Sequence, residues 1–171
     1  MNIDPLLSAG AAALAVAAGA GAFWWRRRGP AQAAATPAAV SGVDALTGLP
    51  TLERFEPLLN ERVIALEKAG RDACLLVIGV DELRLLRDDA GAPWAERVLA
   101  AAAANLRAEI GASTPLARID ADVFGLWLDA PREAGEKLAH RLVQLFDAPL
   151  TVDGHALVVP LSIGVALAPE H

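Results

Sequence analysis

Two kinds of hydrophobic spacing alternate along the chain from residue 44 onward. Apolar residues recur every three or four positions between residues 52 and 66 and stop before Gly70, which predicts an amphipathic helix. Residues 73–80 are almost continuously apolar, which is typical of a strand buried on both faces. The chain therefore begins its domain with a helix that leads into a central strand.

Two further helices and two hairpins are expected after this strand. An alanine-rich helix contains Trp94 and ends near Gly111, and the apolar face of another helix is formed by Leu138, Leu142, Leu145 and Phe146. Short apolar runs flank each of two turns. The first pair of runs is 115–119 and 123–128, around the turn Asp120-Ala121-Asp122, and the second pair is 150–152 and 156–167, around the turn Asp153-Gly154. Helices that alternate with strands and hairpins predict an α/β fold, a mixed sheet flanked by helices.

The N-terminal 28 residues form a different kind of segment. Leu6–Trp25 contains 20 residues without a charge, long enough to span a bilayer as a helix. Arg26–Arg28 follow directly, whereas Met1–Asp4 carry no Lys or Arg. This asymmetry predicts a single-pass anchor with its N-terminus outside and the domain in the cytoplasm. A cleaved signal peptide is the alternative, but it requires basic residues before the apolar run.

The remaining chain divides into a linker and one domain. Residues 29–43 are rich in Ala and Pro without helical or strand periodicity, so they are expected to be a tether. Residues 44–171 form the domain. The formal net charge of −6 argues against a nucleic-acid partner, because phosphate binding needs clustered cations. The lone Cys74 allows no disulfide within the chain, which fits a cytoplasmic domain.

Four short motifs occur in a fixed order along the domain. They are Asp44-Ala45-Leu46-Thr47-Gly48-Leu49-Pro50, Val77-Ile78-Gly79-Val80-Asp81-Glu82-Leu83, the hairpin framed by Ala117-Arg118 and Phe124, and Ser162-Ile163-Gly164-Val165-Ala166. Together they resemble GGDEF domains, the diguanylate cyclase family, whose nucleotidyl-cyclase-like fold the chain is then expected to share. Residues 146–155 resemble GGDEF domains that precede an EAL phosphodiesterase domain. Family members continue with a helix and a strand after the fourth motif, so the resemblance implies a C-terminally incomplete domain.

The resemblance also implies where catalysis would occur. Diguanylate cyclases join two GTP molecules with Mg²⁺ held by two carboxylates and a backbone carbonyl. The first carboxylate position is Gly79 here, although Asp81 lies two residues later on the same side of a strand. The second is Asp122, which is retained and is the candidate catalytic residue. Asp81 and Asp122 are therefore the candidate metal ligands.

Several nucleotide-binding positions of the family are altered. The two signature glycines are Asp120 and Ala121, and the fourth signature residue is Val123. Glycine there lets backbone approach a nucleotide, whereas Asp120 adds negative charge facing phosphates. The guanine-recognition positions are Arg87 and Glu96, and an Asn-to-Arg change replaces a donor and acceptor by a donor alone.

The product-inhibition motif R-x-x-D of the family falls on residues 111–114, whose side chains do not match it. The altered residues also have a simpler interpretation. Asp120 and Asp122 are ordinary turn residues, and Arg87 with Asp88 and Asp89 is a solvated helix end.

The leading hypothesis is a degenerate GGDEF domain anchored in the bacterial inner membrane. It would act as a regulatory or dimerising module in cyclic-di-GMP signalling without cyclase activity, with Mg²⁺ present only where nucleotide binds. Its expected partners are a second copy, a downstream EAL domain, GTP or proteins of the cyclic-di-GMP pathway, and the bilayer. The alternatives are an active cyclase that uses Asp81 and Asp122, and an interaction domain that binds no nucleotide.

Overall fold

The computed structural model of this chain describes residues 42–168. The predicted membrane segment, most of the predicted linker and the last three residues lie outside this range. Among the described residues, no helix has the length and apolar character needed to cross a membrane. The elements are α2 (Leu52–Ala69), β1 (Ala73–Val80), α3 (Leu83–Ala90), α4 (Ala92–Ile110), β2 (Leu116–Arg118), β3 (Val123–Leu128), α5 (Arg132–Asp147), β4 (Leu150–Val152), β5 (His155–Leu157) and β6 (Leu161–Ala168).

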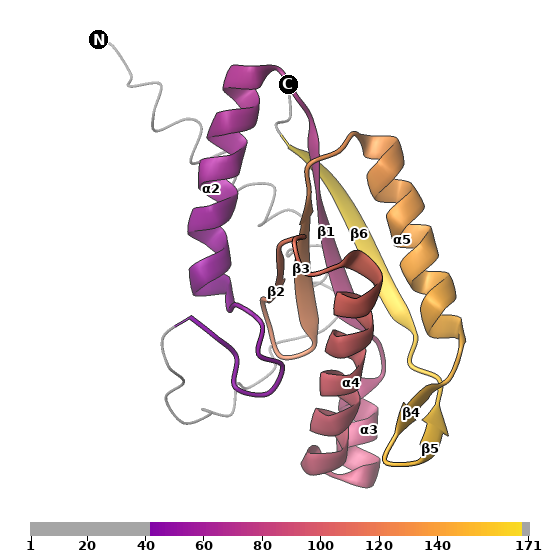
Figure 1. The fold of residues 1–171 in the computed structure, drawn as a ribbon. Coiled ribbons are helices and arrows are strands. Elements are labelled where there is room, and N and C mark those ends of the chain that lie inside the picture. The colour runs from indigo at the N-terminus through magenta and orange to yellow at the C-terminus, as the bar shows by residue number, and fades with distance from the viewer. Residues whose placement is uncertain (1–41, 169–171) are drawn as a thin grey trace.

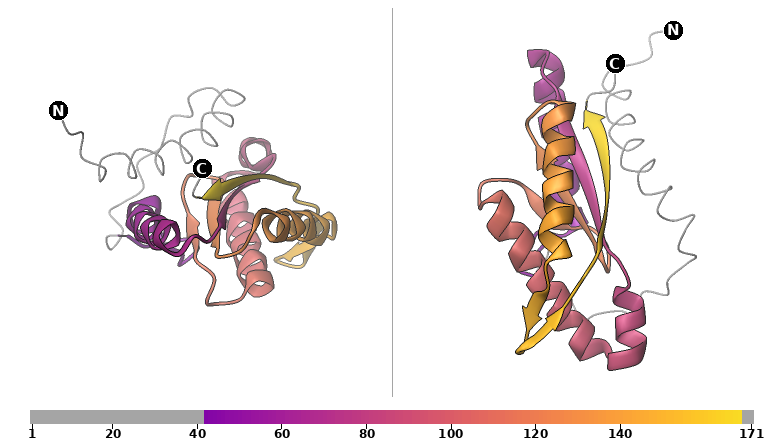
Figure 2. Two further views of the ribbon diagram at one scale, coloured as in Figure 1. Left: turned by 90° about the horizontal axis from the view of Figure 1, so that it is seen from above. Right: turned by 90° about the vertical axis from the view of Figure 1, so that its right-hand side faces the viewer.

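A four-stranded sheet separates two layers of helices (Figures 1 and 2). Successive residues of a strand point to opposite faces. Leu75 and Val77 of β1 pack with α2 on one face, whereas Leu76 and Ile78 join the larger cluster formed with α4 and α5 on the other. Every residue of β1 is buried, which confirms the central strand that the apolar run 73–80 predicts.

The sheet is antiparallel, so the expected mixed sheet is wrong for the described residues. The strand order is β2-β3-β1-β6, and each neighbouring pair is antiparallel. Helices α3 and α4 carry the chain from β1 to β2, and helical crossovers usually join parallel strands. β2 does run in the direction of β1, but β3 of the same hairpin lies between them. The one parallel contact in residues 42–168 is an isolated bridge between Thr51 and Arg118.

The amphipathic helix predicted from the spacing of apolar residues is α2. Its buried residues are Phe55, Leu59, Val63 and Leu66. Leu52 belongs to the same spacing but is exposed, because it occupies the first position of the helix. Gly70 ends the helix with φ of 57°, a left-handed conformation that glycine adopts without strain.

Glycine also permits a close approach between α2 and the sheet. A Cβ atom on Gly125 of β3 would lie 2.8 Å from Cε1 of Phe55 and 3.1 Å from Cγ2 of Ile119. The Phe55 ring therefore occupies the space that a side chain at position 125 would need. This contact seats α2 against the β2–β3 hairpin.

The second predicted hairpin is only partly correct. β4 and β5 pair around Asp153 and Gly154, both at positive φ, as the Asp-Gly turn predicts. The predicted return strand over residues 156–167, however, is divided. β5 ends at Leu157, and β6 begins at Leu161 and pairs with β1 instead. Pro160 lies in the break, where it lacks an N–H for a strand ladder, and its carbonyl accepts a hydrogen bond from the Asp81 backbone.

Candidate functional site

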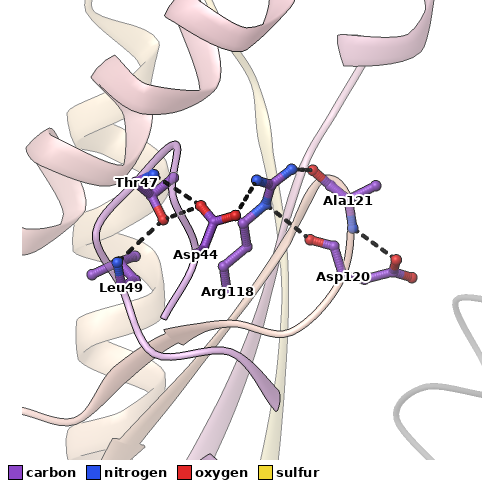
Figure 3. Close-up of polar contacts among 6 residues, drawn as sticks. All are labelled: Asp44, Thr47, Leu49, Arg118, Asp120 and Ala121. Carbon is purple, nitrogen blue, oxygen red and sulfur yellow. Dashed lines mark hydrogen bonds and ion pairs between the residues drawn. The ribbon is translucent and has the colours of Figure 1, made fainter. Parts of the chain in front are cut away.

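The β2–β3 turn is held to the N-terminal loop by one guanidinium group (Figure 3). Nη1 of Arg118 forms an ion pair with Oδ1 of Asp44 at 2.8 Å, and both side chains are largely buried. Nη2 of Arg118 donates to the carbonyl of Ala121 at 2.6 Å, and Nε donates to the carbonyl of Asp120 at 3.3 Å. Arg118 therefore fixes both the position of the turn and the direction of its carbonyl groups.

Asp44 is itself prepared for this contact. Its Oδ2 accepts hydrogen bonds from the backbone N–H of Thr47 at 2.8 Å and from the Thr47 hydroxyl at 2.6 Å. Burial alone would raise the pKa of Asp44, but the hydrogen bonds from Thr47 and the positive charge of Arg118 outweigh it and hold the pKa below its usual value. The carboxylate is therefore charged at neutral pH and available to Arg118.

The turn also satisfies its own backbone donors. Oδ1 of Asp120 accepts the backbone N–H of Ala121 at 2.7 Å. The N–H of Asp120 donates to the carbonyl of Val123 at 3.2 Å, and so does that of Ile119 at 2.9 Å. The N–H groups at both signature-glycine positions are thus engaged within the turn. A phosphate at this turn would find the Ala121 N–H already donated to Asp120, and it would be repelled by the Asp120 carboxylate.

The turn meets the end of β1. The N–H of Val80 donates to the carbonyl of Asp122 at 2.9 Å, and Gly79 lies opposite Val123 in the β1–β3 register. The structure therefore brings the altered position 79 and the retained Asp122 together, as the family resemblance implies. Position 79 supplies no carboxylate to this junction.

Asp81 lies at the same end of β1 but is engaged with another strand. Its Oδ2 accepts the hydroxyl of Ser162 at 2.6 Å, which ties it to the start of β6. No group of three or more His, Cys, Asp or Glu side chains within residues 42–168 is arranged to hold a metal ion. Mg²⁺ prefers near-octahedral oxygen coordination. Because Gly79 has no side-chain oxygen and Asp81 accepts the Ser162 hydroxyl, these residues do not fit the two-carboxylate metal site that the family implies.

The guanine-recognition positions fall on neighbouring helices. Arg87 lies on α3 and Glu96 lies on α4, and the two helices pack against each other across Gly91. Both side chains are exposed. Arg87 falls in the last turn of α3, as the simpler interpretation of a solvated helix end describes.

Arg107 is a structural residue that the sequence analysis missed. Its guanidinium donates to the carbonyls of Gly111, Thr114 and Leu116 at 3.2, 2.7 and 3.4 Å. These bonds shape the loop at residues 111–114, where the family's inhibition motif would lie. Burial lowers the pKa of Arg107 from its ordinary value. A single Arg in the last turn of a predicted helix carries no sequence signal for such a role, because helix ends commonly carry cations.

Comparison with known proteins identifies the fold and its relatives. The family model described as "Diguanylate cyclase, GGDEF domain" matches residues 41–171. Diguanylate cyclase TpbB of Pseudomonas aeruginosa is 30% identical over 132 residues, which cover 75% of this chain and 30% of TpbB. Cyclic di-GMP phosphodiesterase NbdA of the same species is 25% identical over 128 residues, which cover 74% of this chain and 16% of NbdA.

A solved structure agrees with these relatives. The isolated GGDEF domain of TpbB (also YfiN) from Pseudomonas aeruginosa superposes with a TM-score of 0.69 at 27% identity, covering 75% of this chain and 77% of that domain. The chain spans less than a third of the length of the curated relatives described above. The ordered motifs, the antiparallel sheet and the match over residues 41–171 agree, and the chain belongs to the GGDEF family.

Proposed function

We propose that this chain is a GGDEF domain without cyclase activity, which serves as a regulatory or dimerising module in a cyclic-di-GMP signalling protein. The observation that carries the proposal is the hydrogen bond from the Ala121 N–H to the Asp120 carboxylate at 2.7 Å. The Asp120 carboxylate takes the place at the turn that a nucleotide phosphate would need. Its negative charge repels a phosphate, and its hydrogen bond uses the Ala121 N–H that a phosphate would otherwise accept.

The metal ligands support the same conclusion. Phosphoryl transfer depends on divalent cations that neutralise charge on the phosphates, and the protein supplies mainly positioning. Gly79 provides no side chain at the junction with Asp122, and Asp81 is bound to Ser162. Loss of one electrostatic contact in such sites commonly lowers the rate by about 10²–10³. Simultaneous changes at positions 79 and 120 are expected to abolish turnover.

An active cyclase is the second candidate, and one observation favours it. The Val80 N–H bond to the Asp122 carbonyl keeps the turn at the end of β1. Asp122 thereby stays at the end of β1, and its carboxylate is one of the ligand types that the family uses. Asp122 would be the catalytic residue of such an enzyme.

The proposed setting of the domain follows from the sequence and from its relatives. The apolar segment 6–25 and the Arg run 26–28 support an anchor in the bacterial inner membrane with the domain in the cytoplasm. The similarity to NbdA, a phosphodiesterase, and to MucR, a bifunctional cyclase and phosphodiesterase, supports a phosphodiesterase as the module that is regulated. The resemblance of residues 146–155 to GGDEF domains that precede an EAL domain supports EAL as its type. Cell fractionation of the full chain tests the anchor: recovery in the membrane fraction after a carbonate wash is expected.

The deciding experiment measures cyclic-di-GMP formed from GTP and Mg²⁺ by the purified full chain, with Asp122→Ala as the matched control. We expect no product above the control. Product that disappears in Asp122→Ala would overturn the proposal and establish the active cyclase. Titration with labelled GTP separates the remaining alternative, because a domain that binds no nucleotide would show no saturable, Mg²⁺-dependent signal.

A further inference from the structure

A cavity of about 230 Å³ lies between α3 and the segment that joins β5 to β6. Its walls include Leu85 and Val158, which are 58% and 52% exposed and are the two most exposed large hydrophobic side chains of the described residues. Exposed apolar side chains that gather at one place commonly mark an interaction site. Pockets for drug-sized ligands measure about 300–1,000 Å³, so this smaller cavity suits a single large side chain.

The cavity lies beside the altered nucleotide site and shares Asp81 with it, but it opens on the other face of α3. Leu85 and Asp89 line it, and their spacing of four residues places them on one face of α3. Arg87, at the family's guanine position, falls about half a turn away on the opposite face. An occupant of the cavity would therefore contact the reverse side of the helix that carries Arg87.

The charge of the cavity restricts the occupant. Its lining includes the carboxylates of Asp81, Glu82 and Asp89 and contains no Lys, Arg or His. Glu82 and Asp89 are exposed. Anionic lipid and nucleic acid would be repelled by this rim. A segment that presents a large apolar side chain beside several cations would be attracted.

The chain itself contains such a segment. Trp25 is followed by Arg26, Arg27 and Arg28, and no other two cations are adjacent anywhere in the 171 residues. This segment lies outside the described residues, and residues 29–41 join it to the domain. In Figure 1 the indigo loop where the described chain begins lies at the lower left, and α3 and β5 lie at the lower right of the same view.

The connecting residues are long enough to reach the cavity. Thirteen residues, the length of the segment 29–41, span at most about 43 Å when fully extended. A domain of about 130 residues has a radius of gyration of about 14 Å. A short tether also holds the Trp25–Arg28 segment at an effective concentration on the order of millimolar near the domain, so a contact of low intrinsic affinity is enough to populate the docked state.

We propose that Trp25–Arg28 docks on its own domain, with the indole of Trp25 in the cavity and the Arg side chains against the exposed carboxylates of Glu82 and Asp89. The contact would couple the juxtamembrane segment to α3, and it does not depend on whether the domain makes cyclic-di-GMP. Trp25 also suits the membrane interface. Docking and membrane insertion of this side chain therefore compete.

Cross-linking in the full chain tests this contact. Gly29→Cys and Ala90→Cys provide the reactive pair in a Cys74→Ala background, where Ala90 is an exposed residue next to Asp89. A short bismaleimide should give an intramolecular product. Adding Glu82→Gln and Asp89→Asn to this Cys pair should slow formation of the intramolecular product about three- to ten-fold, because each exposed ion pair stabilises the docked state only modestly. Changing Arg26–Arg28 to Gln should have the same effect. Lipid vesicles of phosphatidylcholine should slow it as well.

A matched pair controls for random encounters. Ala65→Cys replaces Ala90→Cys and is likewise an exposed alanine on a helix, but on α2. Its cross-linking should be unaffected by the carboxylate changes. Charge reversal at Glu82 and Asp89 to Lys, combined with Arg26–Arg28 changed to Glu, should restore the Ala90 rate. Equal rates with and without the rim carboxylates would overturn the proposal, and covalent dimers in place of the intramolecular product would show that a second copy supplies the segment.

Discussion

The sequence identifies Arg118 as part of a family motif, but only the structure shows what its side chain binds. The sequence places Ala117-Arg118 before the signature turn and Asp44 at the start of the domain, without linking them. In the fold their side chains meet at 2.8 Å, and Arg118 also holds two turn carbonyls. The contact joins residues that are 74 positions apart, and no local pattern predicts such a pair.

Replacement of Arg118 by Ala is expected to destabilise the domain by about 2–3 kcal/mol, because it leaves the largely buried Asp44 carboxylate without its cation. The matched control is Arg62→Ala, which removes an ion pair to Asp129 whose side chains are 33% and 46% exposed. That change should cost about 0–1 kcal/mol. Urea unfolding of both variants measures the difference. Equal losses would show that the Arg118 contacts contribute no more than an ordinary surface pair.

The charge of Asp44 also gives the stability a defined pH dependence. Its pKa is lowered in the folded state from an ordinary value of 3.8. The stabilisation is therefore fully present well above 3.8 and is lost as the pH falls through the folded-state pKa. Urea unfolding of the wild type and of Asp44→Asn between pH 6 and 3 should show a shallower decline for the variant. Parallel declines would locate the acid sensitivity in other carboxylates.

At the scale of elements, most helices and strands were predictable, but α3 was not among the two helices expected after β1. The period of the apolar residues identified α2, because one buried face fixes that period. The continuous apolar run identified β1, which is buried on both faces, and the short apolar runs around a turn identified the β2–β3 hairpin. The division between β5 and β6 was missed, since an apolar run does not reveal where a strand changes its partner. The close approach of α2 to β3 was also invisible, because it depends on the absence of a side chain at Gly125.

Gly125→Ala is expected to destabilise the domain by about 1–3 kcal/mol, because its Cβ would lie 2.8 Å from the Phe55 ring. The matched control is Gly164→Ala in β6, where a Cβ meets nothing within 4 Å. That change should be neutral or stabilise by about 0.5–1 kcal/mol. Thermal unfolding compares the two variants. A Phe55→Leu change should recover part of the Gly125→Ala loss, and purely additive losses would refute the steric explanation.

At the scale of the whole molecule, the candidate site was predictable as a set of positions but not as an arrangement. The family resemblance placed position 79 and Asp122 together, and the contact between Val80 and Asp122 agrees. It did not indicate that Asp120 accepts the N–H of Ala121 or that Ser162 binds Asp81. Such contacts depend on side-chain directions in the folded turn, which the identity of the residues leaves open.

The burial of β1 predicts an uneven distribution of local stability. β1 is buried throughout and pairs with both β3 and β6, whereas β4 and β5 form a separate two-stranded ribbon beside α4. Native-state hydrogen exchange should therefore be slowest in β1 and faster by at least about a hundredfold in β4 and β5. Uniform protection across both sheets would indicate that the ribbon opens only with the whole domain.

The pair formed by Asp44 and Arg118 has a further consequence for the time course of folding. The two residues lie 74 positions apart in the sequence, so a long loop must close before their ion pair can form. Contacts of this kind tend to form late, after the transition state, where a mutation changes the unfolding rate more than the folding rate. We therefore expect that replacing Arg118 increases the unfolding rate constant, which shortens the lifetime of the native state. The folding rate constant should be nearly unchanged.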